Sequence, residues 1–270
     1  MTEPNIIRLH YQRRGDPRHQ AVLLLHGFMG SADDWDEEIT DPLVESGLQV
    51  LAVDLPGHGR TVVQGDKENY RMECVATAIV NLLQELGIES PHLLGYSMGG
   101  RLALYMAVRH SQHFRRIVLE SASPGLEAKT VWYARVLADA ELARRMHTQP
   151  MEPFLREWYA QPLFASMATR PERLERLIAR RMENDLQGLQ MSLQGMGTGA
   201  QVSLWSELPS VNLPILLIAG GNDSKFCVIG RQIETRCPFS SLEIVPGCGH
   251  NVHFERPREY AKLVREFLHD

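Results

Sequence analysis

The chain of 270 residues contains few cysteines, and nothing in their spacing would join them. Cys74, Cys227, Cys237 and Cys248 are scattered, without a Cys-x-x-Cys pair. Disulfide-rich secreted domains are dense in cysteine, and cysteine zinc sites contain closely spaced pairs. The four scattered cysteines show neither pattern and favour free thiols in a cytoplasmic protein.

Long hydrophobic runs are missing as well. The longest run, AVLLL at 21–25, is far shorter than the roughly 20 apolar residues that span a bilayer. The opening stretch, MTEPNIIRLHYQRR, has no apolar run followed by a small-residue cleavage site. We therefore expect no membrane span and no secretory signal.

An excess of positive charge is absent too, since the net charge is -5. A nucleic-acid partner is not expected, because binding to phosphates needs a basic surface. The sequence has no P-loop and no dinucleotide fingerprint, so we expect no cofactor. His250 and His253 form an H-x-x-H pair without a third ligand nearby in the sequence, so we expect no metal site.

Six apolar runs bounded by turn residues recur along the chain, and most are unbroken rather than alternating. This pattern is typical of strands buried on both faces of a parallel sheet. Amphipathic segments at 74–87 and 99–110 predict helices between strands, and Gly87 is a good residue to end the first. The sequence predicts an open, doubly wound α/β fold. The runs lie at 21–27, 48–57, 91–97, 115–121, 213–220 and 241–250.

The strand–helix alternation stops between residues 122 and 205, where the whole stretch has helical patterning. We therefore predict an α/β core formed by 1–121 and 206–270, with a helical cap of 122–205 inserted into it. A short additional strand is also expected within 5–15.

The stretch GYSMG, at 95–99, has the pattern G-x-S-x-G between an apolar strand and a helix. In that context the pattern predicts a nucleophile elbow, in which Ser97 lies on a sharp, strained turn. The alternative is a purely structural glycine-rich turn.

A serine hydroxyl needs a histidine to accept its proton and a carboxylate to orient that histidine. Asp223 and His250 follow later strands in the order Ser…Asp…His that this fold uses. Alternatively, Asp223 caps a turn and His250 is a loop histidine. The backbone N–H groups of Phe28 and Met98 are expected to form the oxyanion hole.

The stretches LLLHGFMGSADDW, DLPGHG, GYSMGGRLAL and VPGCGHNVHFERP resemble the α/β-hydrolase superfamily across nearly the whole chain. Four further stretches resemble the family of 2-succinyl-6-hydroxy-2,4-cyclohexadiene-1-carboxylate synthases, which belongs to menaquinone and phylloquinone biosynthesis. They are ESASPGLE, WYAQPLFAS, GMGTGAQVSLW and GNDSKF.

The family resemblance implies a pyruvate-eliminating carbon–oxygen lyase. A base removes the proton beside the succinyl ketone of 2-succinyl-5-enolpyruvyl-6-hydroxy-3-cyclohexene-1-carboxylate, and pyruvate leaves. Ser97, with His250 and Asp223, would supply that base. The substrate is a small tricarboxylate.

A tricarboxylate substrate gives a reason for an arginine four residues after Ser97. Arg101 shares a helix face with Ser97, and arginine binds carboxylates through a planar fork. The resemblance implies further substrate-binding residues at Arg135, Arg181, Tyr96 and Trp158. Arg180 competes with Arg181, and each aromatic ring could instead serve packing.

Two other functions are alternatives, of which only the first uses the same triad. One is a serine carboxylesterase or thioesterase, or a carbon–carbon bond hydrolase. The other is a non-catalytic ligand-binding relative of the superfamily. The sequence leaves open the oligomeric state, the motion of the cap and the choice between menaquinone and phylloquinone.

Overall fold

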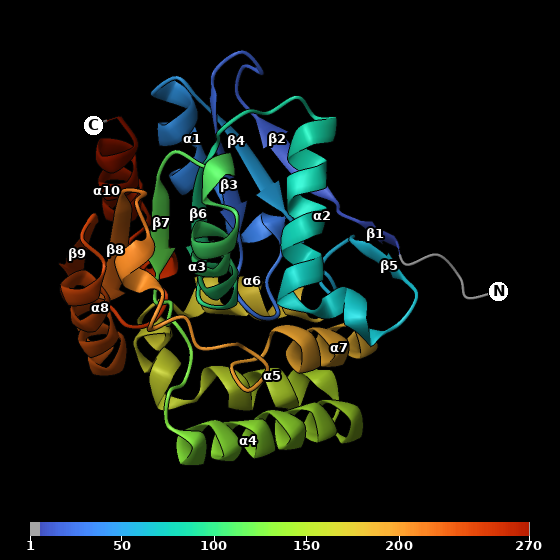
Figure 1. Cartoon of the computed structure of the whole chain (residues 1–270). Helices are drawn as coiled ribbons and strands as arrows, with labels where there is room; N and C mark the ends of the chain where they lie inside the picture. Colours follow the sequence, from blue (N-terminus) through green and yellow to red (C-terminus); the bar gives the residue numbers. More distant parts are fainter. Residues whose placement is uncertain (1–5, 270) are drawn as a thin grey trace.

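A seven-stranded sheet forms the centre of the protein (Figure 1). The computed structural model describes residues 6–269. The strand order is β2-β4-β3-β6-β7-β8-β9, and every neighbouring pair is parallel except β2 and β4. The α/β fold expected from the sequence is confirmed. The strands are β2 (Tyr11–Arg14), β3 (Gln20–Leu25), β4 (Leu48–Val53), β6 (His92–Tyr96), β7 (Ile117–Glu120), β8 (Ile215–Gly220) and β9 (Ser240–Val245).

The segment 5–15, expected to hold one short strand, contains two within its described part. β2 lies at the edge of the main sheet, whereas β1 (Ile6–Arg8) pairs with β5 (Val62–Gln64) in a separate antiparallel ribbon. Both strands are only partly buried. Because a partly buried strand includes polar residues, neither strand appears in the sequence as a continuous apolar run.

Helices cover both faces of the sheet because its inner strands are apolar on both sides. Leu23 and Leu25 of β3 join one core cluster, whereas Val22 and Leu24 join another, since alternate residues of a strand point to opposite faces. Each fully buried side chain of this kind stabilises the fold by about 1.5–3 kcal/mol. The first cluster contains α2 (Met72–Glu85), α3 (Met98–Arg109) and α8 (Ser224–Arg236). The second contains α1 (Glu37–Glu45), α9 (Val252–Glu255) and α10 (Pro257–His269).

The two helices predicted from spacing lie close to their expected positions. The segment 74–87 corresponds to α2, which begins two residues earlier, and 99–110 corresponds to α3. Gly87 follows α2 with a φ of 64°, a left-handed conformation that glycine adopts without strain.

Four helices lie between β7 and β8 in the sequence and gather beyond the carboxyl ends of the strands (Figure 1). They have a hydrophobic cluster of their own, which includes Met146, Phe154 and Met167 and reaches Met29 and Phe254 outside these helices. No helix within 6–269 is long and apolar enough to cross a membrane. The four helices are α4 (Lys129–Thr148), α5 (Met151–Tyr159), α6 (Pro171–Arg181) and α7 (Leu186–Met196).

Candidate active site

Ser97 lies at a strained turn between β6 and α3. Its φ is 50° and its ψ is -105°, a conformation that costs a non-glycine residue free energy. A Cβ added at Gly95 would lie 2.4 Å from the Gly99 carbonyl oxygen, and one at Gly99 would lie 2.3 Å from the Leu25 carbonyl oxygen. Both glycines are therefore required by close backbone approach, as in a nucleophile elbow.

The structure brings His250 and Asp223 to Ser97. The Nδ1 of His250 lies 2.7 Å from Oδ2 of Asp223, and its Nε2 lies 3.1 Å from Oγ of Ser97. With Nδ1 protonated toward the carboxylate, Nε2 is free to accept the serine proton. Oδ1 of Asp223 also accepts from the Phe226 N–H at 3.2 Å. Asp223 therefore caps α8 and orients His250 at the same time, through different oxygens.

Phe28 and Met98 place two backbone N–H groups beside Ser97. Phe28 follows β3, and Met98 is the first residue of α3, where helical N–H groups have no partner within the helix. Within 6–269 neither N–H donates a hydrogen bond to the protein. Both residues line the same cavity as Ser97. Both N–H groups are therefore left available to a ligand in this cavity, and their role as an oxyanion hole stays a prediction.

Two buried histidines shape the loop that carries Phe28. Nε2 of His26 accepts from the Leu55 N–H at 2.9 Å, and Nε2 of His58 accepts from the Met29 N–H at 3.0 Å. Burial lowers the pKa of both imidazoles. They are therefore neutral acceptors that fix the backbone of this loop.

A cavity of about 550 Å³ opens over Ser97 and His250. Its other walls come from α4, α5 and α7 of the inserted segment and from α8 of the core. Trp158 of α5 lies in this wall, with its ring centroid 5.9 Å from that of Phe28. The predicted cap residue Trp158 therefore faces the triad.

Arg101 lines this cavity and is buried. One of its amino groups donates to the Met196 carbonyl oxygen at 2.7 Å and lies 3.5 Å from Oε1 of Gln201. It has no carboxylate partner within the described chain. Burial, and then the charge of Arg135, lower the pKa of Arg101 to about 10. The guanidinium thus stays charged at neutral pH and is available to an anion.

Arg135 also lines the cavity, but it is already paired. Its Nε donates to Oδ1 of Asp139 at 2.7 Å, while Oδ2 of Asp139 accepts from the Gly199 N–H at 2.8 Å. A ligand carboxylate would therefore have to share Arg135 with Asp139.

The structure does not place Arg181 among the residues that line this cavity, and its expected contact with substrate stays a prediction. The two amino groups of Arg181 donate to both oxygens of Asp34, at 2.8 and 2.6 Å, and its Nε donates to the Tyr159 hydroxyl at 3.2 Å. Its fork is fully occupied in a buried ion pair. Arg180 lies outside the cavity too, with an amino group on the Asp33 carbonyl oxygen at 2.9 Å.

Tyr96 also lies outside the lining of the cavity. Its ring packs against His250 at a centroid distance of 5.6 Å and against His253 at 4.7 Å. His253 in turn pairs with buried Glu120 at 2.6 Å. Tyr96 therefore packs against the imidazole of His250, which favours the packing role, and its contact with substrate stays a prediction.

Sequence reasoning missed two cationic side chains in the cavity wall, Arg145 and Lys225. Lys225 belongs to the stretch GNDSKF that carried part of the resemblance, so a signal was present. Arg145 lies in α4 among several charged residues, and no local pattern distinguishes it.

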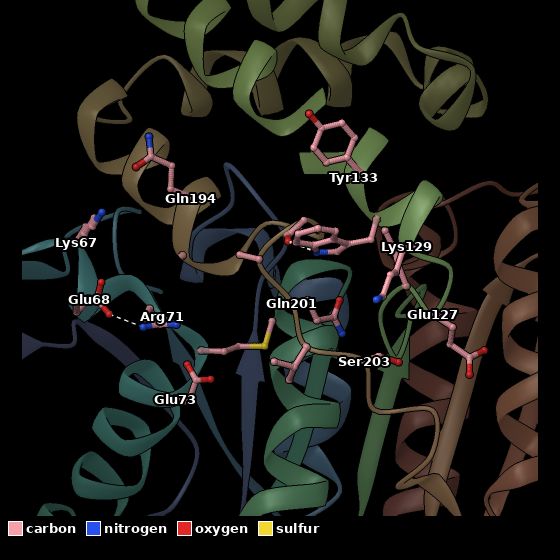
Figure 2. A pocket seen from close by; sticks show the side chains of 17 residues that line it. Lys67, Glu68, Arg71, Glu73, Glu127, Lys129, Tyr133, Gln194, Gln201 and Ser203 are labelled. Carbon is pink, nitrogen blue, oxygen red and sulfur yellow. Dashed lines mark hydrogen bonds and ion pairs between the residues drawn. The ribbon is translucent and has the colours of Figure 1, made fainter. Parts of the chain in front are cut away.

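A larger groove of about 1100 Å³ is lined in part by residues 199–203 (Figure 2). It does not include any member of the triad. Gln201 lines this groove, and its side chain also holds the Ser123 carbonyl oxygen at 2.9 Å and contacts Arg101. Gln201 thus lies between the groove and Arg101.

The sheet order, the elbow and the Ser97–His250–Asp223 geometry define an α/β hydrolase. The family model described as alpha/beta hydrolase fold matches residues 20–257. Individual relatives identify a narrower family within this one.

A Bacillus subtilis protein, provisionally assigned as 2-succinyl-6-hydroxy-2,4-cyclohexadiene-1-carboxylate synthase, is 36% identical over 97% of this chain and 95% of its own length. The synthase of that name from Pectobacterium atrosepticum is 34% identical, with coverages of 92% and 93%. The solved structure of MenH from S. aureus has a TM-score of 0.90 at 28% identity, covering 96% of this chain and 98% of that one. The chain belongs to the α/β-hydrolase family and, within it, to the 2-succinyl-6-hydroxy-2,4-cyclohexadiene-1-carboxylate synthases.

The chain is also similar to a plant protein and to a second solved structure. The chloroplastic protein PHYLLO of Arabidopsis thaliana is 32% identical over 92% of this chain, which corresponds to 15% of that protein. The enol-lactonase from Burkholderia xenovorans has a TM-score of 0.83 at 21% identity, covering 99% of this chain and 100% of that one. The second likeness concerns the fold alone.

Proposed function

We propose that this protein is a lyase that eliminates pyruvate from 2-succinyl-5-enolpyruvyl-6-hydroxy-3-cyclohexene-1-carboxylate, in the biosynthesis of menaquinone or phylloquinone. The product is 2-succinyl-6-hydroxy-2,4-cyclohexadiene-1-carboxylate, the compound in the names of its bacterial relatives. The reaction consumes no water, although the triad resembles that of a hydrolase.

The observation that carries the proposal is the charge of the cavity beside Ser97. Arg101 is buried there without a carboxylate partner in the described chain. A buried charge without a partner destabilises the folded protein. A ligand carboxylate bound to Arg101 would offset this cost. A tricarboxylate does so, whereas a neutral ester would leave Arg101 unpaired.

The proposed chemistry begins with the hydrogen bond between Ser97 and His250. As the Ser97 hydroxyl proton moves to Nε2, Oγ takes a proton from the carbon beside the succinyl ketone. Asp223 holds the imidazole in the required tautomer and stabilises the imidazolium. Ser97 acts here as a general base toward carbon, and no acyl-enzyme forms.

The negative charge then develops on the ketone oxygen, where the N–H groups of Phe28 and Met98 would stabilise it. Collapse of this enolate shifts the ring double bond and breaks the carbon–oxygen bond to the enolpyruvyl group. The leaving enolate of pyruvate takes up the proton that His250 carries. All atoms of the substrate are recovered in the diene and pyruvate.

The inserted segment 122–205 is proposed to act as a cap over the core of 1–121 and 206–270. Support comes from Arg135 and Trp158, which this segment contributes to the walls of the cavity. We further propose a small tricarboxylate as the substrate and a cytoplasmic location. Arg101 would bind one of its carboxylates directly, Arg135 would contact the substrate while still paired with Asp139, and Trp158 would pack on the apolar part.

The test is pyruvate release from the enolpyruvyl substrate, generated in place by the preceding enzyme and coupled to lactate dehydrogenase. Ser97→Ala and a panel of simple esters are assayed in parallel. Rapid pyruvate release that Ser97→Ala abolishes, with slow ester cleavage, would support the lyase. Background pyruvate release with rapid ester cleavage would overturn it in favour of a carboxylesterase or thioesterase.

A further inference from the structure

The cavity over Ser97 contains two cations that no protein carboxylate neutralises. Four cationic side chains line it: Arg101, Arg135, Arg145 and Lys225. Arg135 is paired with Asp139 at 2.7 Å. Arg101 has only a carbonyl and an amide oxygen as partners.

The remaining acidic residues of the cavity are also already paired. Glu157 contacts an amino group of Arg145 at 2.5 Å. Glu141 is held at 2.7 Å by Arg144, which is not part of the cavity lining. Within 6–269, Lys225 forms no ion pair and no hydrogen bond, and the one carboxylate whose charge acts on it, that of Asp223, is already bound to His250. Lys225 and Arg101 are therefore the two cations that a ligand can bind without displacing a protein anion.

Lys225 lies close to the reacting groups. It is in the first turn of α8, two residues after Asp223. Its ammonium nitrogen is 5.3 Å from the centroid of the Phe226 ring, and that ring packs on His250 at 4.7 Å. The Lys225 side chain is exposed and lines the cavity. Partial removal from water and then the charge of Arg135 lower the pKa of its ammonium group.

We propose that Lys225 binds one carboxylate of the substrate at the edge of the cavity, so that it and Arg101 are the two primary anion ligands. This inference rests on the proposed function. It gives Lys225 a role in binding and orientation rather than in proton transfer. A lysine suits an exposed edge, because its flexible point charge can reach a carboxylate without the fixed geometry that arginine demands.

Kinetics of Lys225→Met test this role against matched variants. Because the substitution keeps the length of the side chain and removes its charge, KM should rise roughly tenfold or more while kcat changes less than about threefold. Lys225→Arg, which keeps the charge, should recover most of the loss. Lys129→Met is the control, because Lys129 is exposed and lines the other groove (Figure 2). That control should match the wild type.

Salt provides a readout that a merely structural role would not change. Raising the ionic strength should raise KM for the wild type, and this dependence should weaken in Lys225→Met. A Lys225→Met variant with wild-type KM and wild-type salt dependence would overturn the proposal. So would an equal loss in Lys129→Met.

A binding measurement separates this inference from the proposed function. Calorimetric titration with the dicarboxylate product needs no turnover. If the wild type releases no pyruvate but binds the product, a roughly tenfold weaker affinity in Lys225→Met still supports the anion site while the lyase is rejected. Unchanged affinity, or no binding by the wild type, overturns the assignment of Lys225.

Discussion

Arg101 lies one helical turn beyond Ser97 on α3, and its backbone N–H donates to the Ser97 carbonyl oxygen at 2.9 Å. The helix that begins at the nucleophile thus also fixes a buried charge in the same cavity. Because both side chains depend on one rigid turn, their separation is set before any ligand arrives. This relationship favours an anionic substrate held beside the serine.

Removing triad members should abolish turnover without unfolding the protein. Ser97→Ala and His250→Ala are each expected to lower kcat about 10³-fold or more, and the double variant should lose little beyond either single one. The reason is that the two groups perform one proton transfer. Pyruvate release measures the loss, and circular dichroism verifies folding. Additive losses would contradict the shared step.

Arg101→Met should separate activity from stability. We expect kcat/KM to fall about 100-fold, because a buried charge that binds a carboxylate is lost. The melting temperature should stay constant or rise, since an unpaired buried charge opposes folding. Arg109→Met is the control on the same helix, because Arg109 is exposed and pairs with Glu207. An equal fall in activity for both variants would argue against a specific role for Arg101.

Arg181→Met should act mainly on stability. Asp34 would keep only a longer contact of 3.7 Å with an amino group of Arg180, and a buried carboxylate that loses its main partner costs about 3–5 kcal/mol of unfolding free energy. The double variant Asp34→Leu with Arg181→Met should recover much of that loss. Urea unfolding measures both, with Arg176→Met as the control, because Arg176 is exposed on the same helix. A stable Arg181→Met protein with a greatly raised KM would instead restore Arg181 as a ligand.

The buried histidines predict an acid limit to stability. Burial, and then the charge of His26, lower the pKa of His58 well below 6.5, whereas in the unfolded chain it is near 6.5. Its contribution to stability is therefore complete above about pH 6.5. Below that pH it is lost, by up to ~1.4 kcal/mol for each pH unit, until the folded pKa is reached. Urea unfolding between pH 7.5 and 5.5 should show this fall, and His58→Gln should reduce its slope.

The triad was predictable because its signals are local. Ser97 lies in an elbow that needs Gly95 and Gly99, and Asp223 and His250 each follow an apolar strand. A parallel sheet then brings its strand ends together at one edge, so order along the chain was sufficient. Capping a turn and contacting His250 are not alternatives for Asp223, since one of its oxygens accepts from the Phe226 N–H and the other contacts His250.

The arginines were harder to assign because their partners are distant in sequence. Arg181 shares a buried face with Leu177 and Ile178 of α6, and that spacing already separates it from Arg180. However, the carboxylate that it pairs with, Asp34, precedes it by 147 residues, and no spacing rule connects them. Lys225 was overlooked for the opposite reason. It stood in a recognised motif, but its lack of a partner becomes visible only when the whole cavity is assembled.

The most direct test follows pyruvate and the conjugated diene together, in the wild type and in Ser97→Ala. The account predicts equal molar amounts of both products, formed at the same rate by the wild type and lost together in the variant. Diene formation without pyruvate, or full activity in Ser97→Ala, would contradict a serine-dependent elimination.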